Sequence, residues 1–449
     1  MKFGTTLRTY QVWVFLLSFI LYAAVHAARK TLGTVANPMR DLGYTKAFIS
    51  QMNAAFLLSY SIGMMFTGTL GDRFKPTRVL LVTCLTSAVL TAIVGLMAPR
   101  LYVEGLHYLY IAFWVMNGLA QSCVWPAEVK LMSNWFGEGH SGSIYGIWSA
   151  NGSFGNIIGI GFTALSFSLM GKEETGITWA FLIPCLFLVF ITAFTFLLPD
   201  KRSEAGFTED ASITSDTPSF NKAEPEKLSL WAAWWLPGVL RYSFCYACIK
   251  SINYTIFYWL TPFLEDAGHS NTIVYTISGL NDVGWIFGGL ACGYGSDLMG
   301  SRAPFVGLFI LLAVIPTALI YPCVTSVGAT AVLIALNGFF AGGAGNVVAS
   351  AVCADIGKLE KVKGSPDVTG QVTGIVDGIG AFGAFATQLA IGYTPKDSWA
   401  LIFYALSGML VIAFLLISDL VYRELLEWWR TRYPAMKPEY AIPKNQLIL

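Results

Sequence analysis

Charged side chains are scarce in this sequence of 449 residues, in which Asp, Glu, Lys and Arg together make up 12%. A typical soluble domain carries about twice that fraction. Hydrophobic residues make up 55%, and apolar windows of about 18 residues or more, long enough to cross a bilayer, recur along the whole chain. These features exclude an ordinary soluble domain and predict a polytopic membrane protein. The net charge of +1 gives no reason to expect a nucleic-acid partner.

Clusters of chemically active side chains are missing as well. The sequence contains no nucleophile–base arrangement, no cluster of metal-ligand residues and no glycine-rich phosphate loop leading into a helix. Among its eight cysteines, Cys245 and Cys248 have the C-x-x-C spacing of a redox or metal pair. No His or Cys cluster accompanies them, so two small residues on a buried helix are the favoured interpretation. We therefore expect neither an enzyme nor a bound metal or cofactor.

Twelve apolar stretches are predicted to be transmembrane helices. They cover about residues 10–35, 47–70, 77–98, 106–133, 142–168, 178–198, 231–264, 270–296, 302–322, 327–355, 367–394 and 398–424. The first stretch follows MKFGTTLR, which offers no small-residue cleavage site, so we expect this helix to be retained. The polar segment after the sixth stretch is too poor in apolar groups to order itself. The sequence thus predicts an all-α membrane protein with a six-helix bundle over 1–199, a linker over 200–230, and a second bundle with a tail over 231–449.

The distribution of basic residues predicts an orientation for these helices. Of the 28 Lys and Arg residues, 19 fall on the side that holds both termini and the linker, and five fall on the other side. The remaining four, Arg29, Lys30, Arg241 and Lys250, lie inside predicted helices. Because basic residues concentrate on the cytosolic side of membrane proteins, both termini are expected in the cytosol.

Three short patterns recur at offsets of 220 to 228 residues. GTLGD at 68–72 pairs with GYGSD at 293–297, NGLAQ at 117–121 with NGFFA at 337–341, and YGIWSANGSFGN at 145–156 with TGIVDGIGAFGA at 373–384. Since the three matches keep their order along the chain, they predict two pseudo-symmetric six-helix halves related by an axis along the membrane normal.

A similar offset relates two cations inside predicted helices. Lys250 in the seventh helix lies 221 residues after Arg29 in the first. In a bundle with two-fold pseudo-symmetry, these helices are expected to face each other across a central cavity. Each isolated cation costs roughly 2.5–3.5 kcal/mol on insertion, and the two repel each other. A bound anion relieves both costs, and phosphate suits Arg through bidentate hydrogen bonding. Arg29 and Lys250 are therefore candidate anion ligands, with structural ion pairing as the alternative.

Lys30 and two acids in the helices have two interpretations each. Lys30 follows Arg29 by about 100° around the helix, so it points elsewhere and either binds substrate or pairs with an acid. Asp377 is expected to tune a cation or to act in gating, and direct contact with substrate is the alternative. Asp282 is expected to be structural, because the GWIFGG beside it suggests close helix packing.

Glu128 is an unusual acid in the predicted fourth helix, within WPAEVK. Intramembrane acids usually find a cation. We therefore expect an ion pair with Lys130, two residues further on, or with Arg29. A proton-coupling site is the alternative.

Several longer stretches carry a family resemblance. They are HAARKT (26–31), GDRF..TR (71–78), NGLAQS..WP (117–126), NWFG (134–137), GIWSA..S.GNI.G (146–159), LPGV..YS..YACIK..NY...YWL (236–260), DVG.I.GG (282–289), AS.V.ADIG (349–357) and VTGIVDGIG (372–380). In them the sequence resembles the major facilitator superfamily and, within it, the organophosphate:phosphate antiporters. It is similar in particular to the sugar-phosphate exchangers of solute carrier family 37 and to glycerol-3-phosphate permease-like proteins.

This resemblance implies antiport of a phosphate ester, such as glucose 6-phosphate or glycerol 3-phosphate, against inorganic phosphate by alternating access. It implies that Arg29 and Lys250 are the phosphate ligands. The second helix lacks the Lys of many relatives, and Tyr60 offers a hydroxyl there, with packing as the alternative. Asn151 stands where many relatives have a His. Trp148 is a candidate for the pocket wall, with core packing as the alternative.

Charged loop residues are candidates for gating. Asp72, Arg73 and Arg78 follow the second helix, and Asp297 and Arg302 hold the matching place in the second half. They form either an ion-pair latch or a solvated loop in which exposed pairs contribute little.

The expected partners are small phosphate esters, inorganic phosphate and the lipid bilayer, and the chain is expected to act as a monomer. The resemblance favours the endoplasmic reticulum or another endomembrane, with the plasma membrane as the alternative. Two other functions stay open. One is a proton-coupled carrier of a carboxylate or other organic anion, and the other is a non-transporting anion receptor or scaffold.

Overall fold

The computed structural model describes residues 6–67, 74–100, 104–136, 147–207, 230–357, 368–395 and 398–432. Within these ranges every regular element is a helix. The chain divides into two compact units, which are described separately. Unit 1 comprises the described residues of 1–225, 255–282 and 385–394, and unit 2 comprises those of 226–254, 283–384 and 395–449.

The helices are assigned to the units as follows. Unit 1 holds α1 (Leu7–Thr34), α2 (Ala36–Asp41), α3 (Lys46–Thr67), α5 (Pro76–Met97), α6 (His107–Ser122), α7 (Val124–Trp135), α9 (Asn151–Met170) and α10 (Glu174–Ala193). Unit 2 holds α11 (Leu230–Trp234), α14 (Ala303–Ile320), α15 (Val327–Asn337), α16 (Gly343–Val347), α17 (Cys353–Gly357) and α19 (Trp399–Arg432). The long helices α12 (Val239–Asp266), α13 (Asn271–Met299) and α18 (Val368–Gly392) contribute to both units.

The observed helices lie close to the predicted ranges, with two interruptions. The helix predicted over 231–264 is broken at Pro237 and Gly238, where proline lacks a backbone donor and the glycine has a φ of 87°. The helix predicted over 106–133 is divided at Cys123 into α6 and α7. Residues 208–229 lie outside the described residues, so the division of the chain at the linker stays a prediction.

A third departure is the helical stretch that starts with α15. Two π-helical turns, Gly338–Gly342 and Val348–Val352, separate α15 from α16 and α16 from α17. Hydrophobic periodicity does not predict such turns, because each one changes only a single turn within a continuous helix.

Eight of the described helices are long and apolar enough to cross a membrane. Other long helices, α3, α12 and α13, carry buried polar side chains such as Asn53, Lys250 and Asp282 and do not reach that hydropathy. Polar groups buried inside membrane helices usually serve function. The apolar helices identify the chain as an integral membrane protein, and the polar ones indicate where to look for its site.

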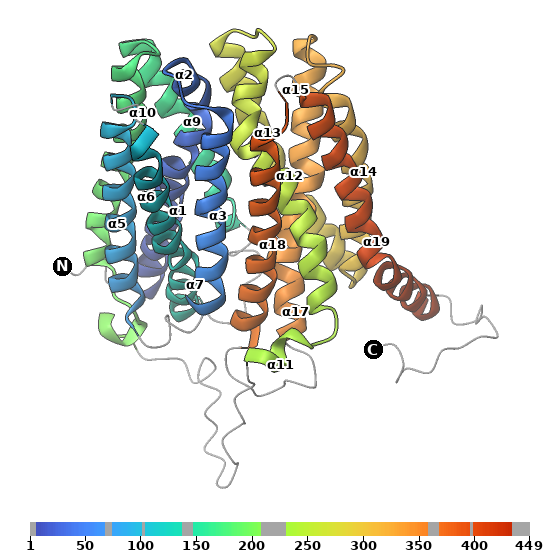
Figure 1. Cartoon of the computed structure of the whole chain (residues 1–449). Helices are drawn as coiled ribbons and strands as arrows, with labels where there is room; N and C mark the ends of the chain where they lie inside the picture. Colours follow the sequence, from blue (N-terminus) through green and yellow to red (C-terminus); the bar gives the residue numbers. More distant parts are fainter. Residues whose placement is uncertain are drawn as a thin grey trace. The chain divides into compact units, whose positions relative to one another are not determined.

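Within unit 1, α1 runs beside α9 and α3 runs beside α6 (Figure 1). Glycines allow the backbones of α1 and α9 to approach closely. A Cβ atom added at Gly155 of α9 would lie 2.2 Å from the carbonyl oxygen of Ala23, and one at Gly159 would lie 2.7 Å from that of Ala27. Small residues at such crossings are typical of membrane helices. This contact fixes the helix that carries Arg29.

Replacing Gly155 by alanine is expected to destabilise the protein, because the new methyl group meets backbone that cannot move aside. Overpacking of this kind costs about 1–3 kcal/mol. Gly161→Ala on the same helix is the matched control, since a Cβ there has nothing within 4 Å. Thermal unfolding in detergent checks both variants, and equal melting temperatures would contradict the close crossing.

Candidate functional site

Arg29 lies in the middle of α1 and is buried, with 4% of its surface exposed. Its Nε atom donates a hydrogen bond to Gln121 Oε1 at 2.7 Å. The guanidinium carbon lies 5.2 Å from the centre of the Phe56 ring and 5.1 Å from that of Tyr60. None of these three partners carries a negative charge, so they orient the guanidinium without neutralising it. A guanidinium oriented in this way can bind an oxyanion through two parallel hydrogen bonds.

Gln121 is itself held by a buried polar ladder between α5 and α6. Its Nε2 atom lies 2.9 Å from Ser87 Oγ and 3.1 Å from Asn117 Oδ1. Asn117 in turn donates to Thr91 Oγ1 at 3.0 Å. Because the amide nitrogen of Gln121 is used in these bonds, its oxygen faces Arg29. NGLAQ was identified from the sequence as part of a repeat and of the family resemblance, with no role assigned to Gln121. Its signal was an Asn and a Gln one turn apart in an apolar helix.

Lys30 has different neighbours from Arg29. Its Nζ atom donates to the backbone carbonyl of Phe257 at 2.5 Å and lies 4.5 Å from the centre of that ring. The carboxylate of Asp282 attracts the same ammonium group. Lys30 is therefore held by α12 and by the first part of α13, within unit 1. The close partners of Lys30 are thus a backbone carbonyl and an aromatic ring, and its role stays a prediction.

Asp282 belongs to a polar cluster that the sequence analysis did not foresee. Asn156 of α9 donates to its Oδ1 atom at 2.6 Å, and His26 Nδ1 lies 3.0 Å from Asn156 Oδ1. These bonds fit the structural role that was expected for Asp282, which stays a prediction. HAARKT and WSANGSFGN already contained His26 and Asn156, but the sequence does not reveal that they meet.

Lys250 and Asp377 form a buried ion pair in unit 2. The Nζ atom of Lys250 lies 2.8 Å from Asp377 Oδ1, and the ammonium lies 5.2 Å from the centre of the Tyr246 ring. A Cβ atom at Gly380 would lie 2.9 Å from Lys250 Cδ, so the glycine lets α18 approach the lysine. The expected role of Asp377, to tune a cation, has a direct geometric basis here.

The remaining predicted site residues of unit 1 differ in their surroundings. Tyr60 lies against Arg29, as described above. Trp148 stacks on Trp125 with ring centres 5.0 Å apart and donates to Ser18 Oγ at 3.0 Å, within the hydrophobic core. This placement favours the core-packing alternative for Trp148. Asn151 is buried, and neither atom of its side-chain amide has a hydrogen-bond partner.

Glu128 does not form the expected ion pair. Its side chain is fully buried, and both carboxylate oxygens lack a hydrogen-bond partner. Lys130 projects about 200° away around the same helix, and Arg29 bonds to Gln121 instead. An ionised carboxylate without partners is too costly in such a place. We therefore take Glu128 to be the neutral acid.

Asp72 and Arg73, two of the predicted gating residues, lie outside the described residues. Arg78 is exposed in the first turn of α5. At this end of α5, Lys75 forms an ion pair, with its Nζ atom 2.6 Å from Glu204 Oε1. The hydrogen bond from the Lys75 ammonium lowers the pKa of the Glu204 carboxyl.

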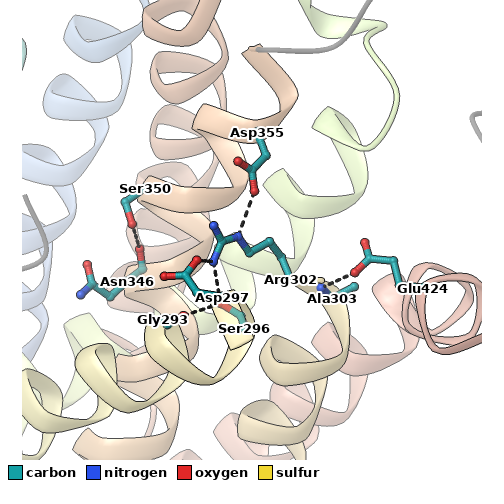
Figure 2. A network of polar contacts seen from close by, with 9 residues as sticks. All are labelled: Gly293, Ser296, Asp297, Arg302, Ala303, Asn346, Ser350, Asp355 and Glu424. Carbon is teal, nitrogen blue, oxygen red and sulfur yellow. Dashed lines mark hydrogen bonds and ion pairs between the residues drawn. The ribbon is translucent and has the colours of Figure 1, made fainter. Parts of the chain in front are cut away.

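Figure 2 shows a polar network around Arg302 in unit 2. The Nε atom of Arg302 donates to Asp355 Oδ2 at 2.9 Å, and its Nη1 atom donates to Asp297. The backbone amide of the following residue donates to Glu424 Oε2 at 2.9 Å. These four charged side chains help to line a cavity of about 650 Å³. The structure thus brings together two predicted gating residues, Asp297 and Arg302, and adds Asp355.

Comparison with known proteins identifies the family of this chain. A family model described as Major Facilitator Superfamily matches residues 18–387. The chain is 31% identical over 469 residues to sugar phosphate exchanger 3 of Bos taurus, an alignment covering 92% of each protein. It is 29% identical over 476 residues to the glucose-6-phosphate exchanger SLC37A2 of Mus musculus, which covers 93% of each.

The fold is similar to that of a solved D-xylose-proton symporter. The TM-score is 0.68 over 92% of this chain and 97% of the other. At 13% identity, this likeness concerns the fold alone. It confirms the all-helical membrane fold that was predicted from the sequence.

Proposed function

This chain belongs to the Major Facilitator Superfamily, in the family of the sugar phosphate exchangers, and we propose that it exchanges a phosphate ester for inorganic phosphate across a membrane. The ester is a sugar phosphate, such as glucose 6-phosphate, or glycerol 3-phosphate. The observation that carries this proposal is Arg29, a buried guanidinium in mid-helix that is oriented by an amide and two aromatic rings.

Arg29 supplies the phosphate ligand in this proposal. With Nε held by Gln121, the plane of the guanidinium has a set direction, and a planar guanidinium suits the oxygens of a phosphate group. Tyr60 covers one face of the cation. Lys30, bonded to a backbone carbonyl of α12, acts as a positioning residue for the helices around Arg29.

Lys250 supplies a second phosphate ligand, with Asp377 as its counter-charge in the absence of phosphate. A phosphate dianion competes with a single carboxylate for the ammonium, so binding weakens the Lys250–Asp377 pair. The carrier opens to each side of the membrane in turn. Phosphate replaces Asp377 as the partner of Lys250 and binds Arg29, so an occupied carrier changes state more readily than an empty one, and exchange is favoured over one-way transport.

Several further features belong to the same proposal. Both termini lie in the cytosol, according to the distribution of basic residues, and the carrier works as a monomer in the endoplasmic reticulum or another endomembrane. It catalyses no chemical reaction and binds no nucleic acid. The Arg302 network, together with Asp72, Arg73 and Arg78, stabilises one of the two access states.

Uptake of labelled phosphate into proteoliposomes tests this function. Vesicles loaded with phosphate are compared with empty ones, and glucose 6-phosphate, glycerol 3-phosphate and phosphoenolpyruvate are added outside as competitors. The expected result is uptake that requires internal phosphate and is inhibited by at least one ester. Binding of phosphate without any uptake would instead support a receptor or scaffold.

Glu128 favours one second candidate, a proton-coupled carrier of a carboxylate or other organic anion. A buried carboxyl without hydrogen-bond partners can take up and release a proton when water reaches it. On that alternative, transport follows a pH gradient and stops when Glu128 is replaced by glutamine.

Under the exchange function, Glu128→Gln is expected to be nearly silent. Glutamine has the shape of the neutral acid, and such volume-conserving replacements usually cost less than about 1.5 kcal/mol. Phosphate exchange should proceed at the wild-type rate with and without an imposed pH gradient, and the melting temperature should be unchanged within a few degrees. Loss of exchange in a folded variant would support the proton-coupled carrier.

A further inference from the structure

One polar cluster of unit 1 has no role in the proposed binding of phosphate. His26, Asn156 and Asp282 are joined in series, with 3.0 Å from His26 Nδ1 to Asn156 Oδ1 and 2.6 Å from Asn156 Nδ2 to Asp282 Oδ1. The carboxylate only accepts, so the amide nitrogen must face it and the amide oxygen must face the histidine. His26 therefore carries its hydrogen on Nδ1. The Ser153 hydroxyl also bonds to Asp282, which fixes the far end of the series.

His26 is the accessible residue of an otherwise buried stretch of α1. Every residue over 21–36 is buried except His26, which is partly exposed. Around the helix, it lies about 60° from Arg29 on one side and about 40° from Lys30 on the other. One turn separates it from both cations. The open face of α1 is thus the face where His26 stands, directly beside the proposed phosphate ligand.

The ring of His26 is fixed on its sides as well. Its centre lies 4.8 Å from that of Tyr22 and 6.5 Å from that of Phe257. A Cβ atom at Gly152 would lie 3.3 Å from His26 Cε1, so the glycine leaves room along the imidazole edge. With Nδ1 bonded to Asn156 and the ring plane held, Nε2 has a defined direction.

We propose that His26 recognises hydroxyl groups in the organic part of the transported phosphate ester through its Nε2 atom. The inference rests on the proposed exchange function. In the neutral ring with hydrogen on Nδ1, Nε2 is an acceptor, which matches a hydroxyl donor and does not match the oxygens of a phosphate dianion. Side chains three residues apart on a helix have Cβ atoms about 5–6 Å apart. An ester whose phosphate is bound by Arg29 therefore brings its hydroxyl-bearing carbons within reach of His26.

Asn156 and Asp282 act through His26 as positioning residues. Asp282 orients the amide, and the amide selects the tautomer that leaves Nε2 as an acceptor. Loss of either residue frees the ring to reverse its hydrogen-bonding pattern. The substrate class that follows is a polyhydroxylated phosphate ester, and a plain alkyl phosphate lacks the groups that His26 would bind.

Competition against phosphate exchange tests this assignment. The full chain is reconstituted, and the half-inhibitory concentrations of glucose 6-phosphate and of ethyl phosphate are measured against labelled phosphate. Both competitors carry the same phosphate group, so the ratio of the two concentrations depends on recognition of the hydroxyl groups and not on the phosphate contact. Losing one neutral hydrogen bond is expected to lower the preference for glucose 6-phosphate roughly five- to tenfold in His26→Phe. Asn156→Leu should show a similar loss, and His26→Gln, which keeps a polar end, a smaller one.

His107→Phe is the matched control, since His107 stacks on Phe48 elsewhere in unit 1 with ring centres 4.2 Å apart. Its ratio should equal that of the wild type. His26→Leu carries the same prediction if the phenylalanine variant does not reconstitute. An unchanged ratio in the His26 variants, or equal weakening of both competitors, overturns the assignment. Absence of phosphate exchange in the wild type overturns the proposed function instead, so the two failures are distinct.

Discussion

Arg29→Ala is expected to abolish phosphate exchange while the protein stays folded in the membrane. A charge-assisted hydrogen bond contributes about 1.5–3 kcal/mol. Losing two of them to a phosphate group lowers affinity by roughly two to four orders of magnitude. Removing the cation also removes a buried charge, so the folded state does not suffer in the same proportion. Labelled-phosphate uptake into phosphate-loaded proteoliposomes gives the rate, and thermal unfolding gives the stability.

Two further variants separate charge from geometry at this position. Arg29→Lys keeps the positive charge but loses the planar fork and the Nε bond to Gln121, so its rate should lie between those of the wild type and Arg29→Ala. Arg100→Ala is the matched control, because this arginine is exposed at the end of α5 and bonds to the carbonyl of Leu96. Exchange at the wild-type rate in Arg29→Ala would remove Arg29 from the binding site.

Lys250→Ala is expected to have the second largest effect, a loss of exchange together with lower stability. The replacement leaves Asp377 as a buried acid without its cation, and breaking such a pair typically costs 3–5 kcal/mol. The double variant Lys250→Met with Asp377→Asn should recover most of the stability but none of the transport. If stability recovers and transport does not, Lys250 has a role in phosphate binding besides its role in the ion pair.

Asp377→Asn alone is expected to raise the affinity for phosphate, whereas Lys250→Ala lowers it. Without its counter-charge, Lys250 should bind phosphate more tightly and release it more slowly, so the half-saturation concentration and the maximal rate both fall. Arg241→Ala on α12, the helix of Lys250, is the control, because Arg241 pairs with Asp419 where both side chains are about two-fifths exposed and such pairs contribute little. A fall in rate without a fall in half-saturation concentration would count against this role of Asp377.

The positions of the helices could be predicted from the sequence, because long apolar windows have few alternative structures. Their interruptions were harder to predict. Pro237 and Gly238 were visible in the sequence as a helix breaker, but the predicted helix ran through them because the apolar pattern continues on both sides. The break at Cys123 has a signal of the same kind in Pro126, which lacks a donor for the carbonyl of Ser122 four residues earlier and displaces it.

The site could be predicted only in part, for a related reason. A cation in mid-helix is visible in the sequence, so Arg29 and Lys250 stood out. Which side chain contacts each cation depends on how the neighbouring helix is rotated about its axis. Gln121 and Asp377 lie 90 to 130 residues away from their cations in the sequence, so the residues around each cation give no indication of these partners. Glu128 illustrates the error that follows. One of its two expected cations, Lys130, was chosen by nearness in sequence, and a separation of two residues puts side chains on nearly opposite faces of a helix.

The two π-helical turns between α15 and α17 have a consequence for the Arg302 network. A π turn holds about one residue more than an α turn, so every later side chain lies about 100° further back around the axis than in a regular helix. Two such turns rotate Asp355 by about 200° relative to a regular helix that starts at Val327. The residue that meets Arg302 is therefore set by where the extra residues are accommodated upstream. Deleting one residue from either π turn would convert it to an α turn and leave Asp355 facing the arginine.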